Sequence, residues 1–144
     1  MKEIVVIDGQ GGKLGRLVIE QLRTAERSSD NKCKFKIHVV GTNSIATATM
    51  LKAGADSGAT GENPVIVACR DADIVVGPIG IIATDALHGE VTAAMAAAVG
   101  ACSAHKILLP VSRCRISVIG TAPLPTAELI SLAVKKVLEA VDNG

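Results

Sequence analysis

The chain has 144 residues and a net charge of +1, and 49% of its residues are hydrophobic. This composition is typical of one folded domain, residues 1–144, and excludes an intrinsically disordered chain. Near-neutral charge and a single aromatic residue, Phe35, argue against a nucleic-acid partner, which calls for a basic surface and aromatic platforms for stacking.

No stretch of the sequence predicts a secretory signal or a membrane span. The first apolar run, 4–7, is interrupted by Asp8, and no run reaches the ~18 residues of a spanning helix. The four cysteines form no CxxC pair, which argues against a zinc site, and scattered thiols are typical of a reducing compartment. We therefore expect a cytoplasmic protein that binds neither a membrane nor a metal.

The first part of the chain alternates strand and helix patterns. Residues 4–7 are continuously apolar, as in a strand buried on both faces. Apolar residues at helical spacing over 14–25 predict a helix that ends in the polar stretch 28–32. Residues 35–41 predict a second strand. A short helix follows over 45–53, preceded by the capping residues Thr-Asn-Ser.

The middle of the chain is less regular. Residues 54–63 are small and predict a loop. The apolar stretch that follows fits a strand or a helix, and we favour a helix because Asn63 can cap it and Pro64 suits its first turn. A third strand over 73–80 and an alanine-rich helix over 91–102 come next.

The C-terminal part predicts two further strands and a helix. Residues 106–111 and 116–120 are both strand-like, and the link between them is too short for a parallel crossover. We therefore expect an antiparallel hairpin at the edge of the sheet, followed by a helix from Pro125. Overall, this alternation predicts an α/β fold: a three-layer, Rossmann-like, doubly wound, mainly parallel sheet of about five strands.

The stretch IVVIDGQGGKLG, residues 4–15, resembles a phosphate-binding loop. Its spacing, G-x-G-G-x-x-G, is close to the dinucleotide fingerprint, with the last glycine one residue late. Gly9 permits the turn off the strand, Gly11 or Gly12 lets a ligand approach the backbone, and Gly15 lets the helix lie close to the sheet. The amides at the helix start would face an anion, assisted by Lys13. The predicted binding residues of this loop are Gly9, Gln10, Gly11, Gly12, Lys13, Leu14 and Gly15. The alternative is a glycine corner that binds nothing.

One element of a dinucleotide site is missing from the sequence. Folds that prefer NAD place Asp or Glu at the end of the second strand, to bind the ribose hydroxyls. Here that position reads Gly41-Thr42-Asn43, and no arginine follows to hold a 2′-phosphate. Thr42 and Asn43 could bind a ribose or a phosphate, so both are candidate site residues.

The end of the third strand adds further candidates. Gly77, Pro78 and Gly80 are expected at the carboxyl edge of the sheet, beside the glycine loop, where ligands of open α/β sheets bind. The alternative is a turn that needs Gly and Pro only for its shape.

Polar residues elsewhere suggest chemistry less specifically. Asp8 is expected to be a turn or capping residue, and Glu62 a helix-capping one. Asp85, His88 and Glu90 are expected to lie in an ordinary solvated loop, with a metal site or an acid–base pair as the alternative. Cys114 lies between two arginines that could lower its pKa, with an exposed turn as the alternative.

Five segments in order, IDGQGG, GTNSIATATMLKAGA, GATGENPVIV, ADIVVGPIGIIA and KILLPV, resemble a bacterial family of uncharacterised proteins, domain-of-unknown-function family 3842. The resemblance runs from residue 3 to about residue 120 and is less clear for the final helix. It implies a Rossmann-like fold but no activity, so no residue inherits a catalytic role. The glycine loop also resembles those of nucleotide-binding enzymes, including prephenate-type dehydrogenases, by fold-level analogy.

These observations favour a module that binds a small phosphate-bearing ligand: NAD(P) or another nucleotide. Two alternatives stay open: a non-catalytic metabolite sensor or regulatory subunit, and a small enzyme acting on a phosphorylated metabolite with Glu90 or Glu62 as base. The predicted sheet and its helices take up residues 1–144, so we expect no separate substrate domain within them. We therefore expect a homo-oligomer, a dimer, in which a second copy completes the site; the alternative is a separate subunit that does so.

Overall fold

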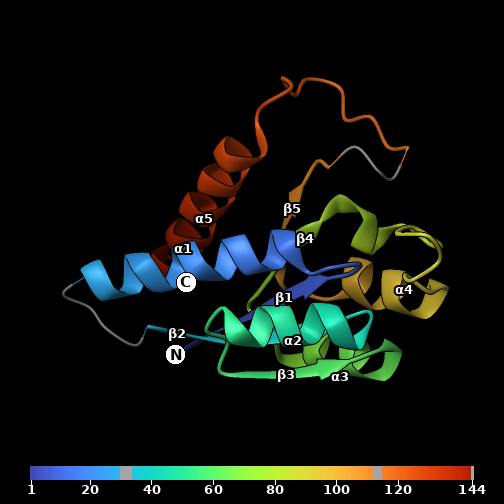
Figure 1. Cartoon of the computed structure of the whole chain (residues 1–144), viewed down its shortest axis with the longest axis horizontal. Helices are drawn as coiled ribbons and strands as arrows, with labels where there is room; N and C mark the ends of the chain where they lie inside the picture. Colours follow the sequence, from blue (N-terminus) through green and yellow to red (C-terminus); the bar gives the residue numbers. More distant parts are fainter. Residues whose placement is uncertain (30–33, 112–114, 144) are drawn as a thin grey trace.

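The computed structural model describes residues 1–29, 34–111 and 115–143 (Figure 1). Its centre is one sheet with strand order β3-β2-β1-β4-β5, and every strand pair in it is parallel. The strands are β1 (Lys2–Asp8), β2 (Phe35–Gly41), β3 (Ser57–Thr60), β4 (Ile74–Pro78) and β5 (His105–Leu109).

Helices cover both faces of the sheet, so the predicted α/β, three-layer arrangement is confirmed (Figure 1). One face carries α1 (Lys13–Ser28), α2 (Ser44–Lys52) and α5 (Thr126–Asn143). The other face carries α3 (Glu62–Asp71), the 3₁₀ turn η1 (Ile79–Ile82) and α4 (Ala93–Ala101).

The central strand β1 shows how the sequence builds the two faces. Successive side chains of a strand point to opposite sides, so Ile4 and Val6 join the core under α1 and α5. Val5 and Ile7 join the core under α3 and α4. Because both sides are covered, β1 has no polar side and reads as the continuous apolar run of a buried parallel strand.

The expected antiparallel hairpin is wrong. Residues 116–120 form no strand. They lie exposed in the arching segment, residues 115–125, which extends away from the sheet toward α5 (Figure 1). The link 112–114 lies outside the described residues. The fifth strand is instead β3, inside the stretch expected to be a loop, and it pairs with β2 in parallel. Its side chains are small and at least partly exposed, so it carries no apolar run.

The middle helix was predicted correctly in kind but not in its start. α3 begins at Glu62 with Gly61 as its N-cap, so Asn63 lies inside the first turn and does not cap the helix. Pro64 does occupy the first turn, where its missing amide hydrogen costs nothing. Within the described ranges, no helix is both long enough and apolar enough to cross a membrane.

Candidate functional site

The glycine loop connects β1 to α1 at the point where the sheet changes direction. β1 lies between β2 and β4. The chain leaves β1 toward β2 with its helix on one face, and it later reaches β4 through α3 on the other face. The connections after β1 and β4 therefore diverge, and the crevice between them is where open α/β sheets bind ligands.

The glycines of the loop do different jobs. Gly12 caps α1 with a left-handed φ of 73°, and a Cβ there would meet the Ala46 carbonyl oxygen of α2 at 2.8 Å. Gly15 allows close packing on the Met50 side chain, so it brings α1 to α2 rather than only to the sheet. A Cβ on Gly11, in contrast, would find no atom within 4 Å, so this part of the loop faces open space.

Asp8 holds the loop from beneath. Its buried carboxylate accepts hydrogen bonds from the amides of Gly9 and Gly15, both at 2.8 Å, and from that of Leu14. Burial, the largest effect, raises the pKa of Asp8, and the negative charge of Glu90 raises it further, while the amide hydrogen bonds oppose both. Asp8 thus plays the turn and capping role expected of it.

Few amides of the loop remain for a ligand. Gly12 donates to the Gly9 carbonyl at 2.9 Å, and Gln10 donates to the Glu90 carboxylate at 3.0 Å. Among the amides of the loop, those of Gly11 and Lys13 have no partner in the described part of the chain. They lie at the start of α1, whose first turn has no acidic residue and whose N-cap, Gly12, has no side chain to bind an amide.

Glu90 supplies a carboxylate that the sequence did not place in this site. Its Oε1 accepts hydrogen bonds from Thr42 Oγ1 at 2.5 Å, Asn43 Nδ2 at 2.7 Å and the Gln10 amide. Burial alone would raise the pKa of Glu90, but these three bonds, together with nearby His88, lower it. The structure therefore brings Thr42 and Asn43 to the glycine loop, as expected, with an acid between them and the loop.

A turn of unusual backbone delivers Glu90. Asp85, Leu87, His88 and Gly89 all have left-handed φ angles, between 56° and 87°. Leu87 is buried, and its side chain packs over Gly9, which leaves no room for a Cβ there. The segment between β4 and α4 is thus anchored on the glycine loop by Leu87 and Glu90.

A hollow of about 290 Å³ lies beside the loop. Pro78 at the end of β4, Val111 after β5 and Thr126 at the start of α5 face the loop across it. Val111 and Thr126 also line a larger hollow of about 650 Å³ beneath the arching segment, so the two adjoin. The full lining of the smaller hollow is Asp8, Gly9, Gln10, Gly11, Gly12, Lys13, Leu14, Leu17, Pro78, Leu87, Val111 and Thr126.

The two glycines predicted near Pro78 do not line this hollow. Gly77 packs β4 against the Ile7 backbone, where a Cβ would not fit, and Gly80 is buried in η1. Their positions are structural in this fold, whereas Pro78 faces the crevice.

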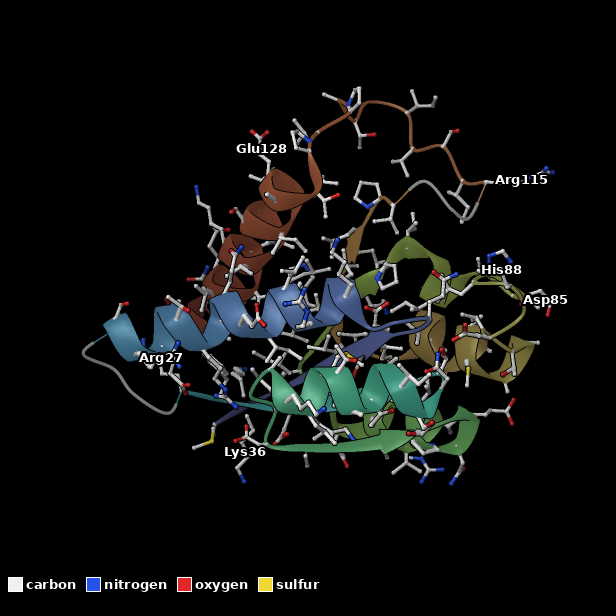
Figure 2. The ribbon with its side chains drawn as sticks, viewed as in Figure 1. Arg27, Lys36, Asp85, His88, Arg115 and Glu128 are labelled. Atoms are coloured by element: carbon white, nitrogen blue, oxygen red, sulfur yellow. The ribbon has the colours of Figure 1, made fainter. Side chains whose placement is uncertain are left out.

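Other polar candidates lie apart from the glycine loop. The Glu62 carboxylate accepts from the Thr92 hydroxyl at 2.6 Å, joining the starts of α3 and α4. Asp85 and His88 are exposed at the outer edge of the molecule (Figure 2). No group of three His, Cys, Asp or Glu side chains that could hold a metal occurs in the described ranges. Cys114 lies outside the described residues.

A second hollow, of about 470 Å³, lies at the opposite edge of the sheet, near Arg23, Phe35 and Asp56. One of the cations that line it, Arg23, is already paired, because it binds Asp56 at 2.7 Å and Glu26 at 2.8 Å. The glycine-loop hollow offers unpartnered amides instead, and for this reason it is the candidate site.

Strand order, faces and loop together define a Rossmann-like α/β protein. The chain belongs to the family DUF3842, described as a domain of unknown function, whose model matches residues 3–142. The match includes α5, so it extends further along the chain than the sequence resemblance indicated. No curated protein and no solved structure matches the chain significantly.

Proposed function

We propose that the protein binds a nucleotide or dinucleotide, with the ligand's phosphate at the start of α1. The observation that carries the proposal is the pair of unpartnered amides, Gly11 and Lys13, beside a hollow at the switch point of the sheet. An anion there would gain hydrogen bonds from the backbone, the field of the helix and the charge of Lys13.

The shape of the hollow supports an elongated ligand. At about 290 Å³, the part next to the loop is at the lower end of the range for small-molecule sites, roughly 300–1,000 Å³. The adjoining space of about 650 Å³ under the arching segment extends it, with Leu124 and Leu129 among its lining residues. A dinucleotide with its phosphates at the loop and one of its two nucleosides toward α5 would use both. Catalysis and metabolite sensing, the two roles left open, both begin with this binding event.

The first test is a thermal-shift screen of the full chain with NAD, NADP, ADP and inorganic pyrophosphate. A ligand at a hundred times its Kd stabilises the folded state by about 2.7 kcal/mol. Gly11→Leu should abolish the shift, because the new side chain occupies open space at the loop without a clash.

Gly100→Leu is the matched control. A Cβ on Gly100 would likewise meet no atom within 4 Å, but this residue lies on α4, outside the residues that line the hollow. This variant should keep the full shift. A shift that persists in Gly11→Leu, or the absence of a shift with all four probes, would contradict the proposal.

A further inference from the structure

Glu90 brings a carboxylate to the end of β2, although it comes from the segment after β4. Thr42 and Asn43 directly follow β2, and both donate to Glu90 Oε1, while Gln10 donates to it from the glycine loop. In sequence, Glu90 is 48 residues from Thr42. The acid that the sequence lacks beside Thr42 is therefore present in space.

The position of this carboxylate is well fixed. Asn43 caps α2 through its Oδ1, which accepts from the Ala46 amide at 2.9 Å. This cap directs Nδ2 toward the Gln10 carbonyl, at 2.9 Å, and toward Glu90. The donors thus come from a helix cap and a loop tied down by Asp8, so Glu90 is held by parts of the fold that do not depend on a ligand.

Building on the proposed function, we propose that Glu90 accepts the ribose hydroxyls of the bound nucleotide and makes the site specific for a ribose with free 2′- and 3′-hydroxyls. All three protein donors end on Oε1, and Oε2 has no donor among the described residues. An ionised carboxylate only accepts hydrogen bonds, so Oε2 suits a hydroxyl donor.

Charge excludes the main competitor, a nucleotide with a 2′-phosphate. Such a group would add a charge of about −1.5 to −2 next to Glu90 and close to Asp8. Among the described residues, no lysine or arginine forms an ion pair with either carboxylate. A 2′-phosphate would therefore meet repulsion from these carboxylates, with no cation paired to either of them in the described ranges.

Isothermal titration of the full chain with NAD and with NADP tests the inference. We expect NAD to bind about tenfold more tightly or better, a difference of about 1.4 kcal/mol. Glu90→Gln removes the charge and keeps the shape, so it should weaken NAD binding and bring the two affinities together. Glu62→Gln makes the same change at a carboxylate held by Thr92, away from the loop, and should leave the ratio unchanged.

The outcomes separate the inference from the proposal on which it rests. Equal affinities, or a preference for NADP, in the unmodified chain would overturn the inference and leave phosphate binding intact. Tighter NAD binding in Glu90→Gln would overturn it too, because it would mean that the carboxylate competes with the ligand. Binding of neither dinucleotide, nor of ADP or pyrophosphate, would overturn the proposed function and the inference together.

Discussion

At the scale of single residues, two acids with opposite pKa shifts meet at the glycine loop. Asp8 is buried, and the cost of burying its charge exceeds what its amide hydrogen bonds return, so its pKa rises. Glu90 is nearer the surface and receives three hydrogen bonds, so its pKa falls. The hydrogen bonds of Glu90 come from distant parts of the chain, whereas those of Asp8 come from the adjoining glycine loop.

Glu90→Gln should lower the free energy of unfolding by about 1 kcal/mol at neutral pH, because charge-assisted hydrogen bonds weaken to neutral ones in a partly solvated place. The pKa of Glu90 is lower in the folded state than its ordinary 4.5. The stabilisation that the Glu90 carboxylate gives the folded state is therefore present above pH 4.5 and is lost as the pH falls through the folded pKa. Urea unfolding of the unmodified chain and of Glu90→Gln over a pH series measures this loss. A difference in unfolding free energy between the two that stays constant on acidification would contradict the prediction.

The same residues show why the site was only partly predictable. Local spacing predicts the glycines, Lys13 and the capping Asn43, because turns and helix starts are local structures. The meeting of Glu90 with Thr42 depends on a turn with left-handed angles at Asp85, Leu87 and His88, which are unusual conformations for side-chain-bearing residues. No pattern in the sequence indicates such a turn.

At the scale of elements, burial decides which strands the sequence reveals. β4 and the central part of β1, residues 4–7, are covered on both faces and apolar, so both strands were predicted correctly. β3 lies at an edge with the sequence Ser-Gly-Ala-Thr, and its place follows from pairing with β2 rather than from its own composition. Residues 116–120 show the reverse: they are apolar enough for a strand, but Ile119 is 94% exposed and joins no sheet.

Helix α5 carries an internal comparison of buried and exposed side chains. Ile130 is fully buried against α1 and the sheet, whereas Leu132 is 52% exposed. Ile130→Ala should cost about 2–5 kcal/mol of unfolding free energy, from lost burial and the cavity left behind. Leu132→Ala should change it by less than about 0.5 kcal/mol. Denaturant midpoints of the two variants provide the measurement. Equal losses of unfolding free energy would mean that α5 is rotated about its axis and packs on the core with a different face.

At the scale of the whole molecule, the sheet has a protected centre and uneven edges. β1 and β4 lie between other strands under helices on both sides, and β3 is a short edge strand with no fully buried residue. The arching segment before α5 reaches out beyond the helices, with Arg115 at its outer end (Figure 2). The expected homo-oligomer stays a prediction at this scale.

Hydrogen exchange should follow this layering. Amides of β1 and β4 open only with global unfolding, so they should exchange most slowly. Those of β3 should exchange faster, because this edge strand can detach from β2 without disturbing the core. Exchange followed by mass spectrometry on peptides that separate the strands gives the order. Equal protection of β3 and β1 would show that the edge is covered in solution.

The tie between Asp8 and the amides of Gly9, Leu14 and Gly15 also bears on the energetics of recognition. A loop rich in glycine would ordinarily lose much freedom when it closes around an anion, and that loss would weaken affinity. Here the protein's own carboxylate has already ordered the backbone during folding. If the proposed function holds, an incoming phosphate would meet a preorganised surface and need no prior rearrangement of the loop, so differences in affinity among ligands should be expressed mainly in their dissociation rates.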